Sequence, residues 1–183
     1  FDGFRLFSVF LKKDLTSRRE ICYNKYEYYM LNKPKGCISA TNDREHKTVI
    51  DIIKSSNKKD LFPVGRLDID TEGLLLITNN GELAHKLLSP KKHVEKKYYV
   101  EVQGILDEND AKLVQEGLDI GEEKLTLPAK MSNINTDEQN GVSSCFLTIH
   151  EGKFHQVKRM MKKLGKSVTY LKRVSMGSLV LDE

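Results

Sequence analysis

Short apolar runs, each closed by a turn, constrain the fold of this 183-residue chain more than any other feature. Strand-favouring residues fill four such runs, at 26–31, 74–78, 97–102 and 168–176. A further strand is expected after the tight-turn pair Asn140-Gly141, where Cys145, Leu147 and Ile149 alternate onto one face. These runs are short and lie close together along the chain, so they predict a sheet with many short connections.

Helical spacing is found in fewer segments. It is clearest at 155–164, where Val157, Met160, Met161 and Leu164 recur at i, i+3, i+4 and i+7 and basic residues cover the rest of the surface. Other helices are expected at 5–21, at 82–88, and from an N-cap at Asp107 to Gly117. Because strands outnumber helices, the predicted fold class is α+β, with a mixed, mostly antiparallel sheet flanked by helices.

Charge is distributed unevenly along the chain. Residues 101–123 carry eight acidic side chains and one basic, whereas residues 151–183 carry eight basic and three acidic. We therefore expect a polarised molecule, with a basic face that attracts phosphate and an acidic stretch that faces away from it. The net charge of +4 does not by itself distinguish a nucleic-acid binder from an ordinary enzyme.

The cysteines and the apolar runs indicate a cytoplasmic location. Cys22, Cys37 and Cys145 are far apart and form no Cys-x-x-Cys pair, which is typical of reduced thiols. No run approaches the roughly 18 apolar residues of a membrane-spanning helix, so no membrane partner is expected. We expect the protein to be a monomer.

Common cofactor and metal motifs fail on spacing. The segment 164–167 resembles the end of a phosphate-binding loop, but Met160 stands where that loop needs a glycine. The segment 150–155 is one residue too long for a His-Glu-x-x-His zinc pair, and Gly152 interrupts it. The sequence therefore predicts neither a metal nor a cofactor.

The segment Gly65 to Gly73 is the strongest candidate for chemistry. Asp68, Asp70 and Glu72 lie within five positions, and the flanking glycines allow close backbone approach. On composition alone, a solvated acidic loop remains the simpler interpretation. A carboxylate here becomes a nucleophile only beside a cation and apolar neighbours, and the basic helix near Lys158 is a possible source of that cation.

The same segment resembles the signature loop of the pseudouridine synthases, in particular the RsuA-type branch (RsuA, RluB, RluE and RluF), whose members act on ribosomal RNA. Three further matches occur in the order that this branch shows, at Tyr29–Pro34, Glu95–Tyr98 and Glu151–Met160. The resemblance extends over residues 26 to 181. It implies the pseudouridine synthase fold and a reaction that uses no cofactor.

The resemblance also implies roles for individual residues. Asp68 matches the family's nucleophilic aspartate, Tyr98 the aromatic residue that stacks on the target base, and Lys158 the basic partner of the aspartate. Leu171 matches an apolar residue of the pocket, and Arg66 a residue that holds RNA. We expect the other RNA contacts to come from basic residues of the C-terminal part, namely Lys153, Arg159, Lys162, Lys163, Lys172 and Arg173. His155 is assigned no chemical role.

Two domains are expected on this basis. Residues 25–183 form the catalytic domain, and residues 1–24 are a remnant or partial N-terminal RNA-binding segment, similar to a ribosomal-protein domain. Family members usually begin with a longer domain of this kind, of which 5–21 resembles only the helical half.

The predicted function is isomerisation of one uridine in ribosomal RNA, in the small-subunit 16S RNA, with the RNA or a subunit assembly intermediate as partner. The alternative is a non-catalytic rRNA-binding or ribosome-assembly factor that uses the basic helix as a phosphate clamp.

Overall fold

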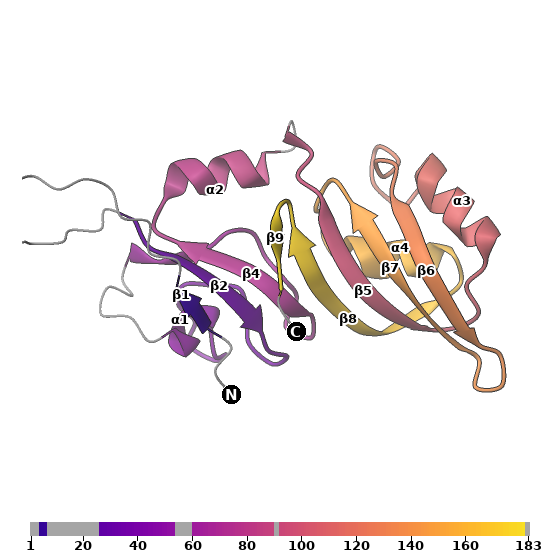
Figure 1. Cartoon of the computed structure of the whole chain (residues 1–183), viewed down its shortest axis with the longest axis horizontal. Helices are drawn as coiled ribbons and strands as arrows, with labels where there is room; N and C mark the ends of the chain where they lie inside the picture. The colour runs from indigo at the N-terminus through magenta and orange to yellow at the C-terminus, as the bar shows by residue number, and fades with distance from the viewer. Residues whose placement is uncertain (1–3, 7–25, 54–59, 90–91, 182–183) are drawn as a thin grey trace, which may run out of the picture.

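The computed structural model describes residues 4–6, 26–53, 60–89 and 92–181, which form one nine-stranded sheet and four helices (Figure 1). The strands are β1 (Phe4–Leu6), β2 (Tyr28–Lys33), β3 (Phe62–Pro63), β4 (Glu72–Thr78), β5 (Lys96–Gln103), β6 (Lys130–Asp137), β7 (Val142–Ile149), β8 (Ser167–Met176) and β9 (Leu179–Val180). The helices are α1 (Val49–Ile52), α2 (Gly81–Leu88), α3 (Glu108–Glu116) and α4 (Gln156–Lys163). Among the described residues, no helix is long and apolar enough to cross a membrane.

The sheet has the order β1-β2-β4-β8-β5-β7-β6, with β3 also beside β4 and β9 also beside β8. Its neighbouring strands are antiparallel except for β4 and β8, which run parallel. That parallel pairing is short, with Glu72 opposite Lys172 and Gly73 opposite Arg173. It joins the two halves of the sheet seen in Figure 1, β1 to β4 on one side and β5 to β9 on the other. The expected α+β class with a mostly antiparallel sheet is confirmed.

Strand β4 is buried on both faces. Leu75 and Ile77 belong to the main hydrophobic core, whereas Leu74 and Leu76 pack into a second cluster that includes Ala84 of α2. This explains why residues 74–77 form an unbroken apolar run instead of an alternating one.

Two helices begin or pack as their sequences indicate. Asp107 caps α3, its side chain accepting hydrogen bonds from the backbone of Asn109 and Asp110, and Gly117 ends that helix. Helix α4 buries Val157, Met160 and Met161 in the main core. It lies behind β5 and β7 in the view of Figure 1, so its remaining surface borders the opposite face of the molecule.

The helix expected from Arg5 is wrong at its start. Residues Phe4–Leu6 form β1 and pair antiparallel with Tyr29–Leu31 of β2. The edge of β2 offers unpaired backbone N–H and C=O groups, and pairing with β1 gives these groups hydrogen-bond partners on both strands. The rest of that expected helix lies outside the described residues, so the assignment of 1–24 to a separate RNA-binding segment remains a prediction.

The parallel junction generates the first testable prediction. Gly73 has a φ of +101°, and an added Cβ would lie 2.2 Å from the main-chain oxygen of Arg173. We expect Gly73→Ala to lower the free energy of unfolding by more than about 3 kcal/mol, because it combines backbone strain with a clash against β8. Thermal denaturation measures this loss.

Gly81→Ala is the matched control. Gly81 has no positive φ, and an added Cβ there meets nothing within 4 Å. Its stability should stay within about 1 kcal/mol of the parent protein. Equal effects of the two substitutions would contradict the close approach of β4 and β8.

Candidate active site

The loop from Gly65 to Thr71 leads into β4 and carries Asp68. The backbone N–H of Leu67 donates to Ser39 Oγ, and that hydroxyl donates back to the Leu67 carbonyl, both at 2.9 Å. The backbone N–H of Thr71 donates to the Asp68 carbonyl at 3.1 Å, which closes a turn directly before β4. The position of Asp68 is therefore fixed by hydrogen bonds on both sides.

A buried lysine forms hydrogen bonds with the main chain of the same loop. Strand β2 continues to Lys33, two residues beyond the expected end, and this side chain has no exposed surface. Its ammonium group donates to main-chain oxygens of Thr71 at 2.8 Å, Asp68 at 3.0 Å and Pro34 at 3.2 Å. Burial lowers the pKa of Lys33, while the nearby acidic residues oppose that shift. Lys33 thus ties the end of β2 to the loop that enters β4.

Lys158 of α4 binds two carboxylates of the loop. Its Nζ lies 3.1 Å from Asp68 Oδ2 and 2.6 Å from Asp70 Oδ1. The expected pairing of Asp68 with Lys158 is present, but the shorter contact belongs to Asp70. The structure therefore contains a three-residue group of two acids and one base instead of a simple pair.

The contacts within this group shift the pKa values of Asp70 and Lys158. The hydrogen bond from Lys158 is the main reason that the pKa of Asp70 lies below its ordinary value of 3.8. Burial alone would lower the pKa of Lys158, but its hydrogen bonds to Asp70 and Asp68 outweigh burial and raise that pKa above 10.5. Lys158 therefore stays protonated at neutral pH.

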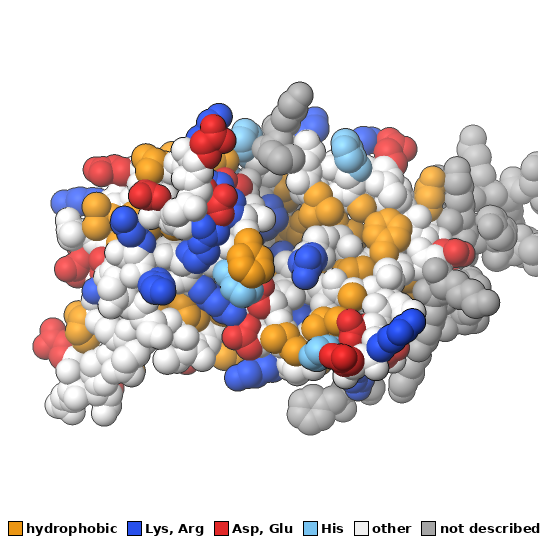
Figure 2. Space-filling view, turned by 180° about the vertical axis from the view of Figure 1, so that it is seen from behind, with side chains coloured by type: hydrophobic (Ala, Val, Ile, Leu, Met, Phe, Trp, Pro, Cys, Tyr) orange, Lys and Arg blue, Asp and Glu red, His pale blue; other side chains and the backbone are white. Residues whose placement is uncertain are grey.

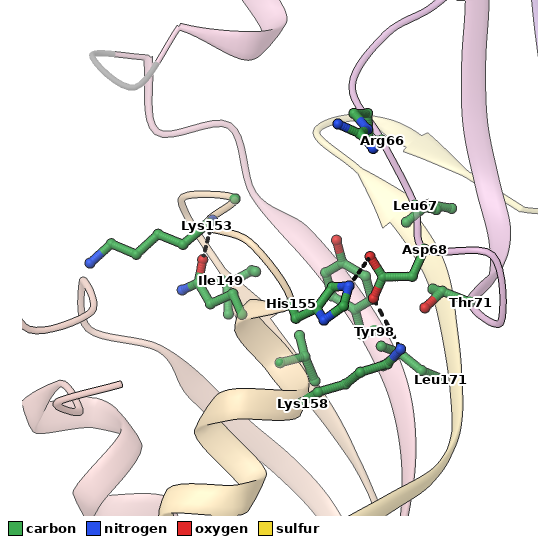
Figure 3. Close-up of a pocket in the computed structure, with 13 residues that line it drawn as sticks. Arg66, Leu67, Asp68, Thr71, Tyr98, Ile149, Lys153, His155, Lys158 and Leu171 are labelled. Atoms are coloured by element: carbon green, nitrogen blue, oxygen red, sulfur yellow. Dashed lines mark hydrogen bonds and ion pairs between the residues drawn. The ribbon is translucent and has the colours of Figure 1, made fainter. Parts of the chain in front are cut away.

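His155 also faces Asp68. Its Nε2 lies 3.5 Å from Asp68 Oδ1, and Figure 3 shows His155, Asp68 and Lys158 pointing toward one another. His155 occupies the N-cap position of α4 in the left-handed conformation, with φ +48°, and its side chain makes no capping hydrogen bond. The side chain instead borders the carboxylate at the mouth of a pocket.

The walls of this pocket come from segments far apart in the sequence. Tyr98 of β5 and Leu171 of β8 are buried beside it, and Arg66 lies at its exposed rim. Its other lining residues are Leu67, Asp68, Thr71, Ile149, Gly152, Lys153, His155, Gln156, Val157 and Lys158. The expected set of Asp68, Tyr98, Lys158 and Leu171 thus meets in one pocket, which combines apolar walls with a charged edge.

The expected RNA contacts separate into two groups. Arg66, Lys162 and Lys163 are exposed, and Lys172 is partly buried. Arg173 is only 2% exposed, and its Nε donates to the Leu74 carbonyl at 2.7 Å. The prediction that Arg173 is a surface contact for phosphate is therefore wrong, because its side chain is buried at the junction of β4 and β8.

The acidic stretch does not face away from the basic helix as expected. Arg159 Nη1 lies 2.6 Å from Glu122 Oε1, and Lys166 Nζ lies 3.5 Å from Asp110 Oδ2. Lys153 donates to the main-chain oxygens of Lys124 and Leu125. Opposite charges have packed against one another, so Lys153 and Arg159 hold protein groups.

Sequence reasoning assigned no role to Lys33 and His155. Tyr29, Leu31 and Lys33 alternate along β2 and are all buried, so strand periodicity was a usable signal for Lys33. Nothing in the local sequence indicated that His155 would adopt a left-handed conformation and turn toward Asp68. Among the described residues, no group of three or more His, Cys, Asp or Glu side chains is placed to hold a metal ion.

The pocket, with a carboxylate between two basic side chains and a buried tyrosine, defines a candidate enzyme site on an α+β sheet. A family model described as "RNA pseudouridylate synthase" matches residues 27–163, which include Asp68, Tyr98 and Lys158. The chain belongs to this family of isomerases, and its relatives place it in the RsuA/RluB-type branch.

Three relatives illustrate that placement. A Bacillus subtilis protein described as "Uncharacterized RNA pseudouridine synthase YtzG" is 47% identical over 161 residues, covering 87% of this chain and 66% of the relative. Ribosomal small subunit pseudouridine synthase A of Pseudomonas aeruginosa is 38% identical, covering 99% of this chain and 76% of the relative. Ribosomal large subunit pseudouridine synthase B of Bacillus subtilis is 42% identical, covering 80% and 59%. The chain thus spans between about three fifths and three quarters of these proteins.

A solved structure supports the fold. The crystal structure of a pseudouridylate synthase superposes with a TM-score of 0.78 at 38% identity, covering 86% of this chain and 66% of that one. The pseudouridine synthase fold is therefore confirmed.

The Asp70–Lys158 contact generates a prediction about pH. The folded-state pKa of Asp70 is depressed, so this carboxylate stabilises the fold above its ordinary value of 3.8 and loses that contribution as pH falls through the lowered pKa. We expect the difference in unfolding free energy between the parent protein and Asp70→Asn to be constant at neutral pH and to vanish in strong acid. Urea denaturation as a function of pH measures it.

The same measurement on Asp43→Asn serves as the comparison for the Asp70 variant. The pKa of Asp43 is also lowered, mainly by backbone hydrogen bonds from Glu45 and His46. Asp43 does not touch Lys158. High salt should weaken the Asp70 contribution, since the Asp70 side chain is 50% exposed. A contribution from Asp70 that grows as pH falls below 3.8 would contradict the sign of this shift.

Proposed function

We propose that this chain converts a uridine of ribosomal RNA into pseudouridine. The observation that carries the proposal is Asp68, held 3.1 Å from Lys158 at a pocket that Tyr98 and Leu171 line, in a chain of this family. The reaction breaks the bond from the ribose to N1 of uracil and forms one to C5. C5 loses a proton and N1 gains one, so the atoms balance without any co-reactant.

Four residues of the pocket have a part in this reaction. Asp68 is the nucleophile, and Lys158 compensates the charge on its carboxylate. A uridine within an RNA helix must leave its stack before Asp68 can reach the glycosidic bond, and this costs a few kcal/mol. The face of Tyr98 recovers part of that cost by stacking on the extruded base, and Leu171 packs against it.

Exposed basic residues hold the RNA around the pocket. Arg66 lies at the rim beside Asp68, and Lys162 and Lys163 extend from the surface of α4. Lys172 is partly buried on β8 and lies on the opposite face of that strand from Leu171, so it is not part of this set. The exposed side chains bind phosphates, so affinity falls as the salt concentration rises.

We assign the target uridine to 16S rRNA. The small-subunit synthase A of Pseudomonas aeruginosa aligns with nearly the whole chain, which supports this assignment. The second candidate is 23S rRNA, which the 42% identity to the large-subunit synthase B of Bacillus subtilis supports. Mapping pseudouridine in both rRNAs, from cells with and without the gene, distinguishes them: loss of a 16S site upholds the assignment, and loss of a 23S site alone overturns it.

The nucleophile is tested by Asp68→Asn. This variant keeps the shape of the side chain and removes its charge, so we expect pseudouridine formation to fall by at least about 1,000-fold. Release of tritium from 16S and 23S transcripts labelled at C5 of uridine measures the reaction, because C5 loses its hydrogen when pseudouridine forms. Normal turnover by the Asn variant would exclude Asp68 as the nucleophile.

Two lysines on α4 provide a matched pair that tests the non-catalytic alternative. Lys158 binds Asp68, whereas Lys162 is exposed on the same helix. We expect Lys158→Ala to reduce kcat and Lys162→Ala to reduce RNA affinity with kcat unchanged. A phosphate clamp without catalysis would show tight, salt-sensitive rRNA binding by the parent protein and no pseudouridine at all.

A further inference from the structure

Phe154 is 73% exposed, more than any other large hydrophobic side chain in the part of the chain that the structure describes. It directly precedes His155, which borders Asp68 at the pocket. A phenylalanine in water contributes little to folding, because its apolar surface is not removed from solvent. Its position beside the candidate active site therefore needs another explanation.

One face of the Phe154 ring is already stacked. The centroids of Phe154 and His155 are 3.8 Å apart, and their planes differ by 18°. His155 in turn approaches Asp68 to 3.5 Å. The high exposure of Phe154 leaves its other face open to solvent, so the two rings form a ledge that runs outward from the carboxylate.

The backbone of this ledge is held firmly. The Phe154 carbonyl accepts a hydrogen bond of 3.1 Å from Arg159, which also binds Glu122. The Lys153 N–H donates to Gln156 Oε1 at 2.9 Å. Gln156 is buried and donates to Glu151 Oε1, also at 2.9 Å. The ring is thus presented on a fixed support beside the pocket.

The surroundings of the ledge favour nucleic acid as its occupant. Lys and Arg side chains gather in the middle of the face in Figure 2, which is the side of the molecule on which α4 lies. Lys153 and Arg159 already bind protein carbonyl and carboxylate groups, whereas Lys162 and Lys163 farther along α4 are exposed and supply positive charge on this side of the molecule. A flat apolar face in a positive field suits a nucleobase joined to phosphates.

We propose that Phe154 stacks on a base next to the target uridine and so sets the position of the RNA strand at the pocket. This inference rests on the proposed function, because it takes RNA to be the substrate. The stack adds binding energy outside the reacting bond, so Phe154 contributes to KM while Asp68 contributes to kcat. Stacking accepts any base, and the contact positions the strand without reading its sequence.

A tryptophan replacement tests the contact directly, because the chain contains no tryptophan of its own. The indole of Phe154→Trp should be quenched when 16S or 23S transcript is added. Leu113→Trp on α3 is the control, since Leu113 is 38% exposed on a helix that contributes nothing to the pocket. Its emission should not respond to RNA. Quenching at Leu113 but not at Phe154 would overturn the proposal.

Steady-state kinetics separate stacking from general apolar contact. We expect Phe154→Leu to raise KM about 5- to 30-fold with kcat within about twofold, and Phe154→Trp to keep KM near the parent value. An unchanged KM in Phe154→Leu would overturn the inference while leaving the proposed function intact. A parent protein that forms no pseudouridine overturns the proposed function, and the emission measurement then decides by itself whether RNA stacks on Phe154.

Discussion

The ammonium group of Lys33 is enclosed by the main chain that carries Asp68. A buried cation is costly unless hydrogen bonds replace its lost water, and here carbonyl oxygens of Thr71, Asp68 and Pro34 supply them. The loop depends on the lysine in turn, because each of these oxygens would lose a donor without it; among the described residues, the Asp68 carbonyl would keep only the Thr71 N–H and the Pro34 carbonyl only the Cys37 thiol. The loop thereby gains a defined shape in front of β4, and Asp68 is presented to the pocket from a fixed backbone.

The parallel junction of β4 and β8 determines what that loop meets. The loop ends where β4 begins, and β8 runs beside that end with β5 as its other neighbour. Tyr98 and Leu171 therefore reach the pocket from β5 and β8, while α4, directly before β8 in the chain, brings His155 and Lys158 to the carboxylate. Close contact between Gly73 and Arg173 makes this convergence possible, which is also why Arg173 is buried instead of exposed to RNA.

Local patterns were sufficient for most elements, whereas the site residues were predicted from the resemblance to the family. The turn at Asn140-Gly141, the cap at Asp107 and the apolar face of α4 depend on neighbouring residues, and each was predicted correctly. The residues predicted from that resemblance, Asp68, Tyr98 and Lys158, lie in one pocket, and their roles stay predictions. Features that depend on distant partners were missed: strand β1 needs the edge of β2, and Arg159 pairs with an acidic residue 37 positions away. Lys33 continues the buried alternation of β2, but the oxygens that bind its ammonium group belong largely to a loop 35 to 38 positions later. Charge counts along a sequence cannot show such pairings.

The role of Lys33 as the support of the loop that carries Asp68 is tested most directly by a crystal structure of Lys33→Met, which keeps an unbranched side chain of similar length and removes every donor. We expect residues 66–71 to shift and the distance from Asp68 Oδ2 to Lys158 Nζ, 3.1 Å in the parent protein, to lengthen beyond the limit of about 4 Å for an ion pair. An unchanged loop with that distance preserved would contradict that role.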